Sequence, residues 1–422
     1  MWRSNWIVVL ALLLTAAVFA AQVFFLEGAL DDVTLVRPSP EPSEVPDDVT
    51  RAEALAGGQG FKAVFGDGRG MPGYPVFLSW FVAGFSQPFV AARFFQLFLA
   101  AMVVPFAFLI LNPLLRSQGW ALAGSVVFAA WVMLFYHAAE LTADALCLFF
   151  YALFCYQLAR LQQAYNRSQF LPMVVLAVLV YFKSAMALVF IPFALVVETR
   201  RGGGARGVTV LGPLVIVIVL MLPWSIWLSV RNGDFVPLTT SSGYRMYVGT
   251  GVTTRPDTSA TAVPDLPSSS AEKQKLFDPG LVAAARHETA DLDAADRNRV
   301  YRRNAMAVWV SRPLKTASYG AAKVFHSFGF SFRHTRDTLM VLQLVASLLL
   351  SVFLWRRRLH REWCVFMWGA ALVVALEAFV FLPDARFSAL IFDFPALVVS
   401  VAGVAALVRG TTGGPQPGSP KK

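Results

Sequence analysis

The chain has little cysteine, little charge and no common metal or nucleotide motif, and each shortage excludes a class of protein. Only 3 of its 422 residues are cysteine, and all three lie in or beside apolar runs, so no disulfide framework is indicated. Its 5 histidines form no pair at a metal-ligand spacing, and neither a GxGxxG nor a Walker A pattern occurs. These absences argue against a disulfide-stapled domain, a histidine-based metal site and a nucleotide-binding loop.

Hydrophobic residues dominate the composition of the chain. They make up 57% of the chain and charged residues only 15%, which is typical of a polytopic membrane protein. Apolar runs of about 20 residues can cross a hydrocarbon core of roughly 30 Å. We therefore predict an all-α polytopic bundle of about ten spans, with outer-face loops and short amphipathic helices. The predicted spans are residues 6–26, 89–111, 120–137, 141–159, 170–182, 184–198, 208–230, 338–355, 363–381 and 387–408.

Two apolar runs have another interpretation. Residues 6–26 also fit a signal peptide cleaved after Val18-Phe19-Ala20, although the run is longer than such peptides usually are. Residues 74–88 are too short to span, which indicates a re-entrant or interfacial segment.

Polar stretches divide the chain into parts. A helix-like segment at 294–310 lies within the longest polar stretch. The predicted parts are an N-terminal membrane module at 1–230 with a catalytic first outer loop at 27–72, an outer-face loop region at 231–336 that is partly disordered at 253–275, C-terminal membrane spans at 337–410, and a disordered cytoplasmic tail at 411–422.

The formal net charge of +10 raises the question of a nucleic-acid partner. We reject it, because the basic residues form short clusters between apolar spans, and such clusters are topology signals. With the N-terminus inside, every short basic loop falls on one side. This predicts a cell-membrane protein with both termini cytoplasmic. The residues on the inner side are Arg3, Arg116, Arg160, Arg167, Arg200, Arg201, Arg206, the run 355–361, Arg409, Lys421 and Lys422.

Several ionisable residues lie near the outer ends of the predicted spans, where a charge costs at least about 2.5–3.5 kcal/mol if it enters the bilayer. For Lys183 the alternative is a lysine that snorkels between two helices. Asp384 and Arg386 can instead form a structural pair, and one of Glu140 and Asp144 can serve only as a cap. The complete set is His137, Glu140, Asp144, Lys183, Glu377, Asp384, Arg386 and Asp393.

The stretch 47–75, DDVTRAEALAGGQGFKAVFGDGRGMPGYP, is unusually dense in acids, bases and turns for a loop between spans. It follows the first apolar run directly. We predict that it caps a catalytic cavity at the outer membrane face.

These residues resemble a known family. Gly58-x-Gly60-Phe61 followed by Arg69-x-x-Pro72-Gly73-Tyr74-Pro75 is similar to the first-loop signature of polytopic GT-C glycosyltransferases. The nearest resemblance is to bacterial relatives of dolichyl-phosphate-mannose–protein mannosyltransferases and to aminoarabinose transferases. Further similar segments occur in order along nearly the whole chain. They are Leu222-Pro223-Trp224, the run 231–238, Gly243-Tyr244, the run 247–250, the run 304–313, Lys323 and Asp384-x-Arg386-Phe387.

The resemblance implies an inverting transfer of a sugar from a polyprenyl-phosphate donor to an acceptor hydroxyl at the outer face. A first-loop carboxylate would be the general base, and the chain departs from the family pattern here, so Asp48, Asp47 and Glu44 all remain candidates. Asp144 falls near the family's second acid, at the start of the fourth predicted span, and could position the base or the acceptor. The phosphate would be held by basic residues. The implied phosphate ligands are Arg69, Lys183 and Arg386, and the implied supporting residues are Glu140, Tyr74 and Asp384.

The implied partners are membrane lipid, a lipid-linked sugar donor and an acceptor whose identity the sequence leaves open. No metal site is predicted, although a few carboxylates can bind a divalent metal weakly, so metal dependence stays open. A flippase or transporter with charged outer gates is one alternative, but internal repeats and mid-membrane broken helices are not apparent. A surface-glycan polymerase or ligase is another, although such enzymes usually place their main loop late in the chain.

Overall fold

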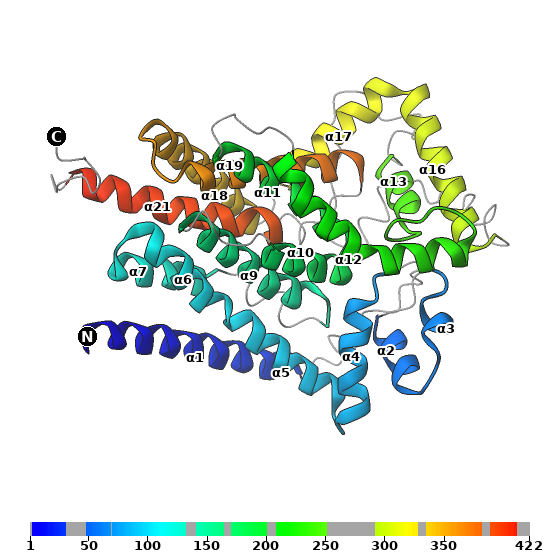
Figure 1. Cartoon of the computed structure of the whole chain (residues 1–422), viewed down its shortest axis with the longest axis horizontal. Helices are drawn as coiled ribbons and strands as arrows, with labels where there is room; N and C mark the ends of the chain where they lie inside the picture. The colour runs from blue at the N-terminus through cyan, green and yellow to red at the C-terminus, as the bar shows by residue number, and fades with distance from the viewer. Residues whose placement is uncertain are drawn as a thin grey trace.

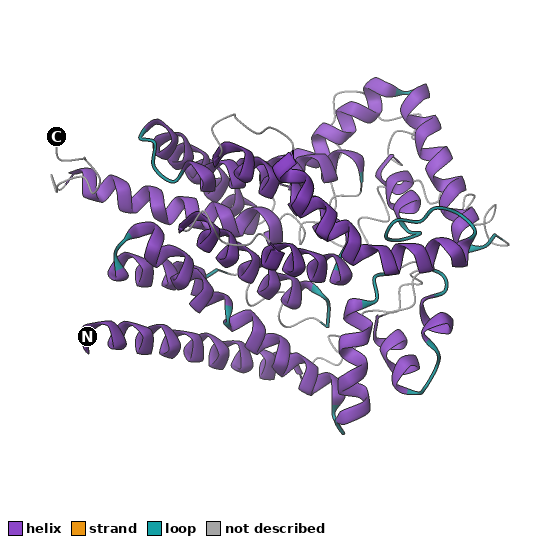
Figure 2. Ribbon diagram, in the orientation of Figure 1, coloured by secondary structure: helices purple, strands orange, loops and turns teal. Residues whose placement is uncertain are grey.

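The structure, a computed structural model, consists of helices joined by short loops and turns in the part of the chain that it describes (Figure 2). No strand occurs in that part, which confirms the all-α prediction. The predicted disordered stretch at 253–275 and the tail at 412–422 lie outside it. The described residues are 2–30, 48–68, 70–131, 141–163, 170–200, 208–250, 292–327, 335–381 and 389–411.

Five described helices are long and apolar enough to cross a membrane, so by length and composition the chain is an all-α membrane protein. These five are Pro88–Leu115, Asp144–Leu161, Gly212–Asn232, Arg361–Val380 and Ile391–Gly410. Five further apolar helices are shorter, namely Val9–Val23, Gln118–Ala129, Phe170–Phe182, Ser184–Thr199 and Val341–Arg356.

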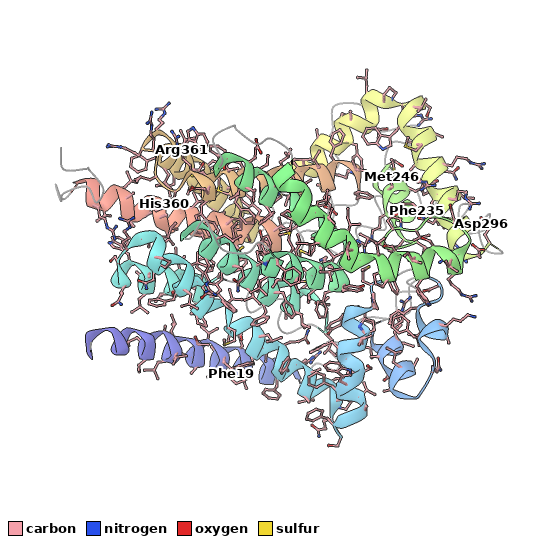
Figure 3. The ribbon with its side chains drawn as sticks, in the orientation of Figure 1. Phe19, Phe235, Met246, Asp296, His360 and Arg361 are labelled. Carbon is pink, nitrogen blue, oxygen red and sulfur yellow. The ribbon has the colours of Figure 1, made fainter. Side chains whose placement is uncertain are left out.

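The first helices form one side of the bundle (Figure 1). Helix α1 (Trp2–Leu30) lies along α5 (Pro88–Ala101), where the Phe19 and Phe98 rings meet edge to face with centroids 6.4 Å apart (Figure 3). Helix α6 (Val103–Leu115) continues α5, and α7 (Gln118–Ala129) packs back against α6.

The central helices lie between these first helices and the C-terminal helices. Helix α10 ends directly before Lys183 and a 3₁₀ turn begins directly after it, so the helical chain is interrupted between the predicted spans 170–182 and 184–198. These elements are α9 (Asp144–Gln163), α10 (Phe170–Phe182), η2 (Ser184–Val189), α11 (Phe190–Arg200) and α12 (Val208–Asn232).

The core is formed where α9 meets the C-terminal helices. The Tyr151 ring of α9 lies 6.4 Å from the Phe366 ring, and the Phe154 and Phe193 rings lie 5.9 Å apart. All four residues are fully buried. The C-terminal elements are α18 (Thr335–Arg356), α19 (Arg361–Val380), the π-helical turn η4 (Ala389–Asp393) and α21 (Phe394–Thr411).

Short helices gather at one end of the bundle, on the right in Figure 1. The predicted helix at 294–310 is present as α16, whose N-terminus is capped by the Asp293 side chain accepting from the Asp296 amide at 2.8 Å. At twelve residues, α4 is about 18 Å long and too short to span, as predicted for this segment. The short helices are α2 (Asp48–Ala56), α3 (Phe61–Phe65), α4 (Gly73–Gly84), α13 (Ser242–Thr250), α16 (Ala294–Ser311) and α17 (Pro313–Ser327).

The opposite end holds the start of α1, the α6–α7 turn and the end of α21 (Figure 1). There the Arg409 guanidinium of α21 donates to the Leu115 carbonyl oxygen at the end of α6 at 2.8 Å. His360 and Arg361 lie at this end, whereas Asp296 lies at the other (Figure 3). The two loop regions predicted to lie outside thus share one end of the bundle.

A buried hydroxyl ties α9 to the π-helical turn. Tyr151 donates to the Ile391 carbonyl oxygen at 2.9 Å, and a π-helical turn does not satisfy its carbonyls by the usual i+4 amide. We expect Tyr151→Phe to lower the free energy of unfolding by about 0.6–1.7 kcal/mol, the range measured for hydrogen bonds between membrane helices. Unfolding in detergent measures this. Tyr156→Phe, at a half-buried position on the same helix, is the control and should leave it unchanged.

Candidate functional site

Four of the ten residues predicted for the site lie in the described part of the chain. Asp48 is the first residue of α2, Tyr74 the second of α4 and Asp144 the first of α9, and Lys183 directly precedes η2. The structure brings the elements that carry these four together at the end of the bundle where the short helices gather. The other six lie outside the described residues, and their roles stay predictions. They are Glu44, Asp47, Arg69, Glu140, Asp384 and Arg386.

Asp144 and Lys183 form an ion pair. The lysine nitrogen lies 3.1 Å from a carboxylate oxygen, and the two side chains are only 18% and 5% exposed, with the lysine the more accessible. Lys183 has an extended backbone, which lets its side chain leave the α10–η2 bend toward α9. The carboxylate is placed at the N-terminus of α9, where the helix dipole favours a negative charge. The alternative of a snorkelling Lys183 does not fit a lysine paired in this way.

Tyr74 occupies the centre of a second polar group. It is 1% exposed, and its hydroxyl accepts from the Gln96 amide at 3.3 Å, while the same amide donates to the Thr142 carbonyl oxygen at 2.7 Å. Burial raises the pKa of the Tyr74 hydroxyl well above its usual value, and the charges of Asp48 and Asp144 raise it further. The phenol is therefore neutral at physiological pH, and two carboxylates from separate helices lie within electrostatic reach of it.

Arg93 and Gln96 were missed by the sequence analysis. Both lie on α5 inside a long apolar run and are almost completely buried, with Arg93 at 2% and Gln96 at 0% exposure. The Arg93 charge lowers the pKa of the Tyr74 hydroxyl, whereas the two carboxylates raise it. An arginine within the run PFVAARFFQLFLAA was a signal that could have been used, since such residues are expensive in a membrane and usually functional.

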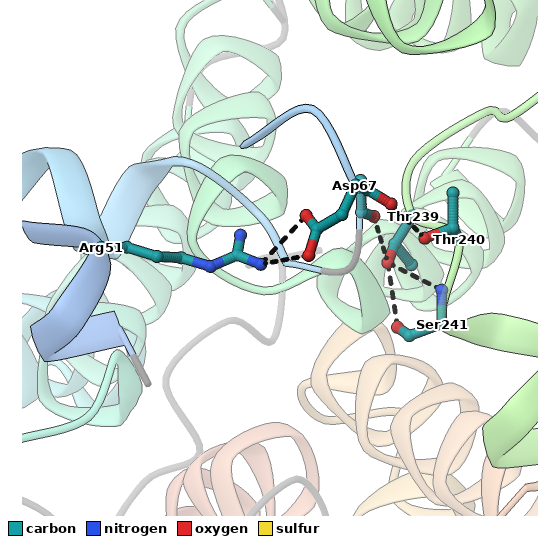
Figure 4. Close-up of polar contacts among 6 residues, drawn as sticks. Arg51, Asp67, Thr239, Thr240 and Ser241 are labelled. Atoms are coloured by element: carbon teal, nitrogen blue, oxygen red, sulfur yellow. Dashed lines mark hydrogen bonds and ion pairs between the residues drawn. The ribbon is translucent and has the colours of Figure 1, made fainter. Parts of the chain in front are cut away.

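The first loop is fastened to the chain that follows α12 (Figure 4). Arg51 of α2 is 2% exposed and donates to both carboxylate oxygens of Asp67 at 3.1 Å. Thr240 donates to the Gly68 carbonyl oxygen from its amide at 2.9 Å and to the Asp67 carbonyl oxygen from its hydroxyl at 2.8 Å. The Thr239 hydroxyl also donates to Gly68, at 3.0 Å. These bonds fix the turn immediately before residue 69.

A close backbone contact sets the position of α4. A methyl group on Gly73 would lie only 2.6 Å from the Tyr181 carbonyl oxygen and 3.1 Å from the Phe182 amide nitrogen. The glycine therefore lets the start of α4 touch the end of α10. This contact places Tyr74 beside the hinge that carries Lys183.

The described residues thus offer two carboxylates, two cations and a neutral phenol in one region. Carboxylates can act as general bases, and lysine and arginine can hold a phosphate. Within the described ranges, no group of three or more histidine, cysteine, aspartate or glutamate residues could hold a metal ion.

The Asp144–Lys183 pair can be tested by a double-mutant cycle. Because both groups are mostly buried, we expect Lys183→Met alone to cost about 3–5 kcal/mol in unfolding free energy, since it removes the positive charge beside a buried carboxylate. The double variant Asp144→Asn/Lys183→Met should regain much of this loss. Thermal unfolding in detergent measures both. Arg299→Met is the control, because the Arg299–Asp234 pair is exposed, and its melting temperature should not change. Equal stability of Lys183→Met and wild type would contradict the pairing.

The close contact at Gly73 makes a second prediction. Gly73→Ala forces α4 away from α10, and overpacking of this kind costs about 1–3 kcal/mol. The melting temperature should fall accordingly. Gly84→Ala at the other end of α4 meets nothing within 4 Å and should not lower it. A stable Gly73→Ala protein would show that α4 does not depend on this approach.

Comparisons of the chain with models of protein families, with curated proteins and with solved structures found no match. A functional assignment for this chain therefore rests on its own residues and their geometry, together with the resemblance of its motifs to those of GT-C glycosyltransferases.

Proposed function

We propose that the protein is a GT-C-like membrane glycosyltransferase that moves a sugar from a polyprenyl-phosphate donor to an acceptor hydroxyl at the outer face of the cell membrane. One observation carries the proposal. Acids from α2 and α9 lie with the cation before η2 at the end of the bundle where the resembling first loop is fastened.

In the proposed reaction, the acceptor oxygen bonds to the anomeric carbon as the bond from that carbon to the phosphate oxygen breaks. The electron pair leaves with the polyprenyl phosphate, and the acceptor proton passes to a first-loop carboxylate. Asp48 is the described candidate for this base, with Asp47 and Glu44 as its rivals. General-base catalysis contributes about 10²–10⁴-fold to a rate.

Lys183 supplies positive charge for the leaving phosphate, in company with Arg69 and Arg386. Its ion pair with Asp144 holds the ammonium in a fixed direction before the donor arrives. Arg93 adds a second buried cation, whose charge acts on Tyr74. Preorganised cations of this kind stabilise charge that grows on a leaving group.

The membrane arrangement that we propose has about ten spans. The five long apolar helices and the five shorter ones together give that number, and several shorter helices pack within the bundle beside the long ones. The end with Arg116, the run 355–361 and Arg409 would face the cytoplasm, along with both termini. The end with the short helices would then face outward, where the lipid-linked donor is used.

The donor's lipid tail is proposed to lie beside α4. Rings of Tyr74, Phe77 and Phe81 follow one another along this helix at 6.0 and 5.1 Å, starting within the polar group. Trp80 and Phe85 are 72% and 56% exposed, which suits a helix in contact with lipid.

The experiment supplies purified protein in detergent with a panel of polyprenyl-phosphate hexoses and pentoses and a cell-envelope extract as acceptor source. Released polyprenyl phosphate is measured. We expect Asp48→Asn to lower the rate about 10²–10⁴-fold. Glu53→Gln, which changes an exposed carboxylate on the same helix, should retain it.

Asp47→Asn and Glu44→Gln are assayed in parallel, since either could carry the role in place of Asp48. Full activity in all three single variants would remove the general-base proposal. Wild-type protein that releases no lipid phosphate, yet moves the lipid across proteoliposome membranes, would favour the flippase alternative.

A further inference from the structure

A lysine is buried where three helices meet at the outer end of the bundle. Lys323 of α17 is 1% exposed, and its side-chain nitrogen donates to the Gly249 carbonyl oxygen at 3.0 Å and to the Phe381 carbonyl oxygen at 2.7 Å. Gly249 lies near the end of α13, and Phe381 is the residue that ends α19. One side chain thus bonds to the backbone at residues 249 and 381, which are 132 positions apart in the chain.

We infer that Lys323 is a latch that holds the α13–α16–α17 helices on the end of α19 and fixes the point from which the chain continues to Asp384 and Arg386. Apolar contacts also cross this junction. The Trp309 and Phe379 rings lie 5.5 Å apart, and the Phe379 ring also packs closely on Gly320 of α17. Apolar contacts bring α17 and α19 together, and the lysine bonds give the junction a fixed register.

The Lys323 nitrogen bonds to two carbonyl oxygens, and a neutral amine can donate both of these hydrogen bonds. Burial lowers the pKa of Lys323 from its usual 10.5 to about 7, and Glu377 partly offsets the fall. The closed junction therefore accepts the neutral lysine more readily than the charged one.

Among the other charged groups around the junction, one carboxylate faces the amine and the arginines are exposed. Glu377 of α19 is 8% exposed and faces the amine, and the Tyr319 ring centroid on α17 lies 5.3 Å from it. From α13 the contact is a backbone carbonyl, and Arg245 of that helix is exposed. The basic residues of α16 around its packed face, Arg302, Arg303 and Arg312, are exposed as well.

The stability of the closed junction depends on pH because Lys323 has different pKa values in the closed and opened states. When the junction opens and the lysine is hydrated, its pKa is near 10.5, so opening takes up a proton at any pH between about 7 and 10.5. Raising the pH through this window favours the closed junction. Below pH 7 the lysine is protonated in both the closed and the opened junction. The free energy that favours the closed junction then no longer changes with pH and stays at its lowest value. The latch is therefore tightest at alkaline pH and loosens on acidification.

The test is hydrogen exchange of the full chain in detergent at about pH 6.5 and pH 9, with protection factors corrected for the intrinsic exchange rate. In wild type we expect protection of α13 and α17 to rise on the order of 10–100-fold between these pH values, by proton linkage. Lys323→Met and Lys323→Arg should lose this dependence, because neither side chain titrates there. Lys62→Met, which changes an exposed lysine, should keep it.

A second measurement keeps the inference testable if Lys323→Met does not fold. Acetylation of Lys323 in the wild type, followed by mass spectrometry across pH, should give a midpoint near 7. A midpoint near 10.5, or pH-dependent protection that survives in Lys323→Arg, overturns the latch. Both readouts are structural, so they do not depend on whether the chain transfers sugar.

Discussion

The ion pair between Lys183 and Asp144 is the interaction on which the proposed site depends. Neither charge could be buried alone at this depth without a cost of several kcal/mol, so each determines the position of the other. The pair joins the bend where α10 ends at Phe182 to the first residue of α9. Gly73 brings α4 against the same bend, which places Tyr74 near the ion pair.

If the first loop carries the general base, as we propose, it must be held as firmly as the helices around it, since misplacement of about 1 Å can cost 10²-fold in rate. The Arg51–Asp67 pair and the two threonines after α12 provide this hold (Figure 4). Arg51 also lies 5.5 Å from the Phe65 ring, so the same guanidinium joins α2 to α3. The first loop is thus anchored by residues more than 170 positions later in the chain.

The sequence was informative where a physical rule acts over a continuous stretch. Apolar length predicted the long helices, the break at Lys183 and the short α4, because a membrane core sets a minimum length for a span. It was uninformative where a single polar residue is compensated by a distant part of the chain. Arg93 and Gln96 sit in an apolar run, and Arg51 in a polar loop, yet all three are buried. Arg51 pairs with Asp67 from a turn 16 positions later, and Gln96 donates to Tyr74 and to the Thr142 carbonyl oxygen, so their partners could not be read from the neighbouring residues. An arginine inside an apolar run does flag Arg93 as unusual, but the run does not show that Arg93 lies near Tyr74.

Two buried lysines at the same end of the molecule show how differently a cation can be compensated. Lys183 forms an ion pair with a carboxylate at 3.1 Å, which suits a residue proposed to attract phosphate. Lys323 donates to two backbone carbonyl oxygens, and burial lowers its pKa to about 7 although the Glu377 charge partly offsets the fall. Since a neutral amine attracts a phosphate poorly, the first lysine suits donor binding and the second suits helix positioning. The partner atoms, rather than the residue type, separate the two roles.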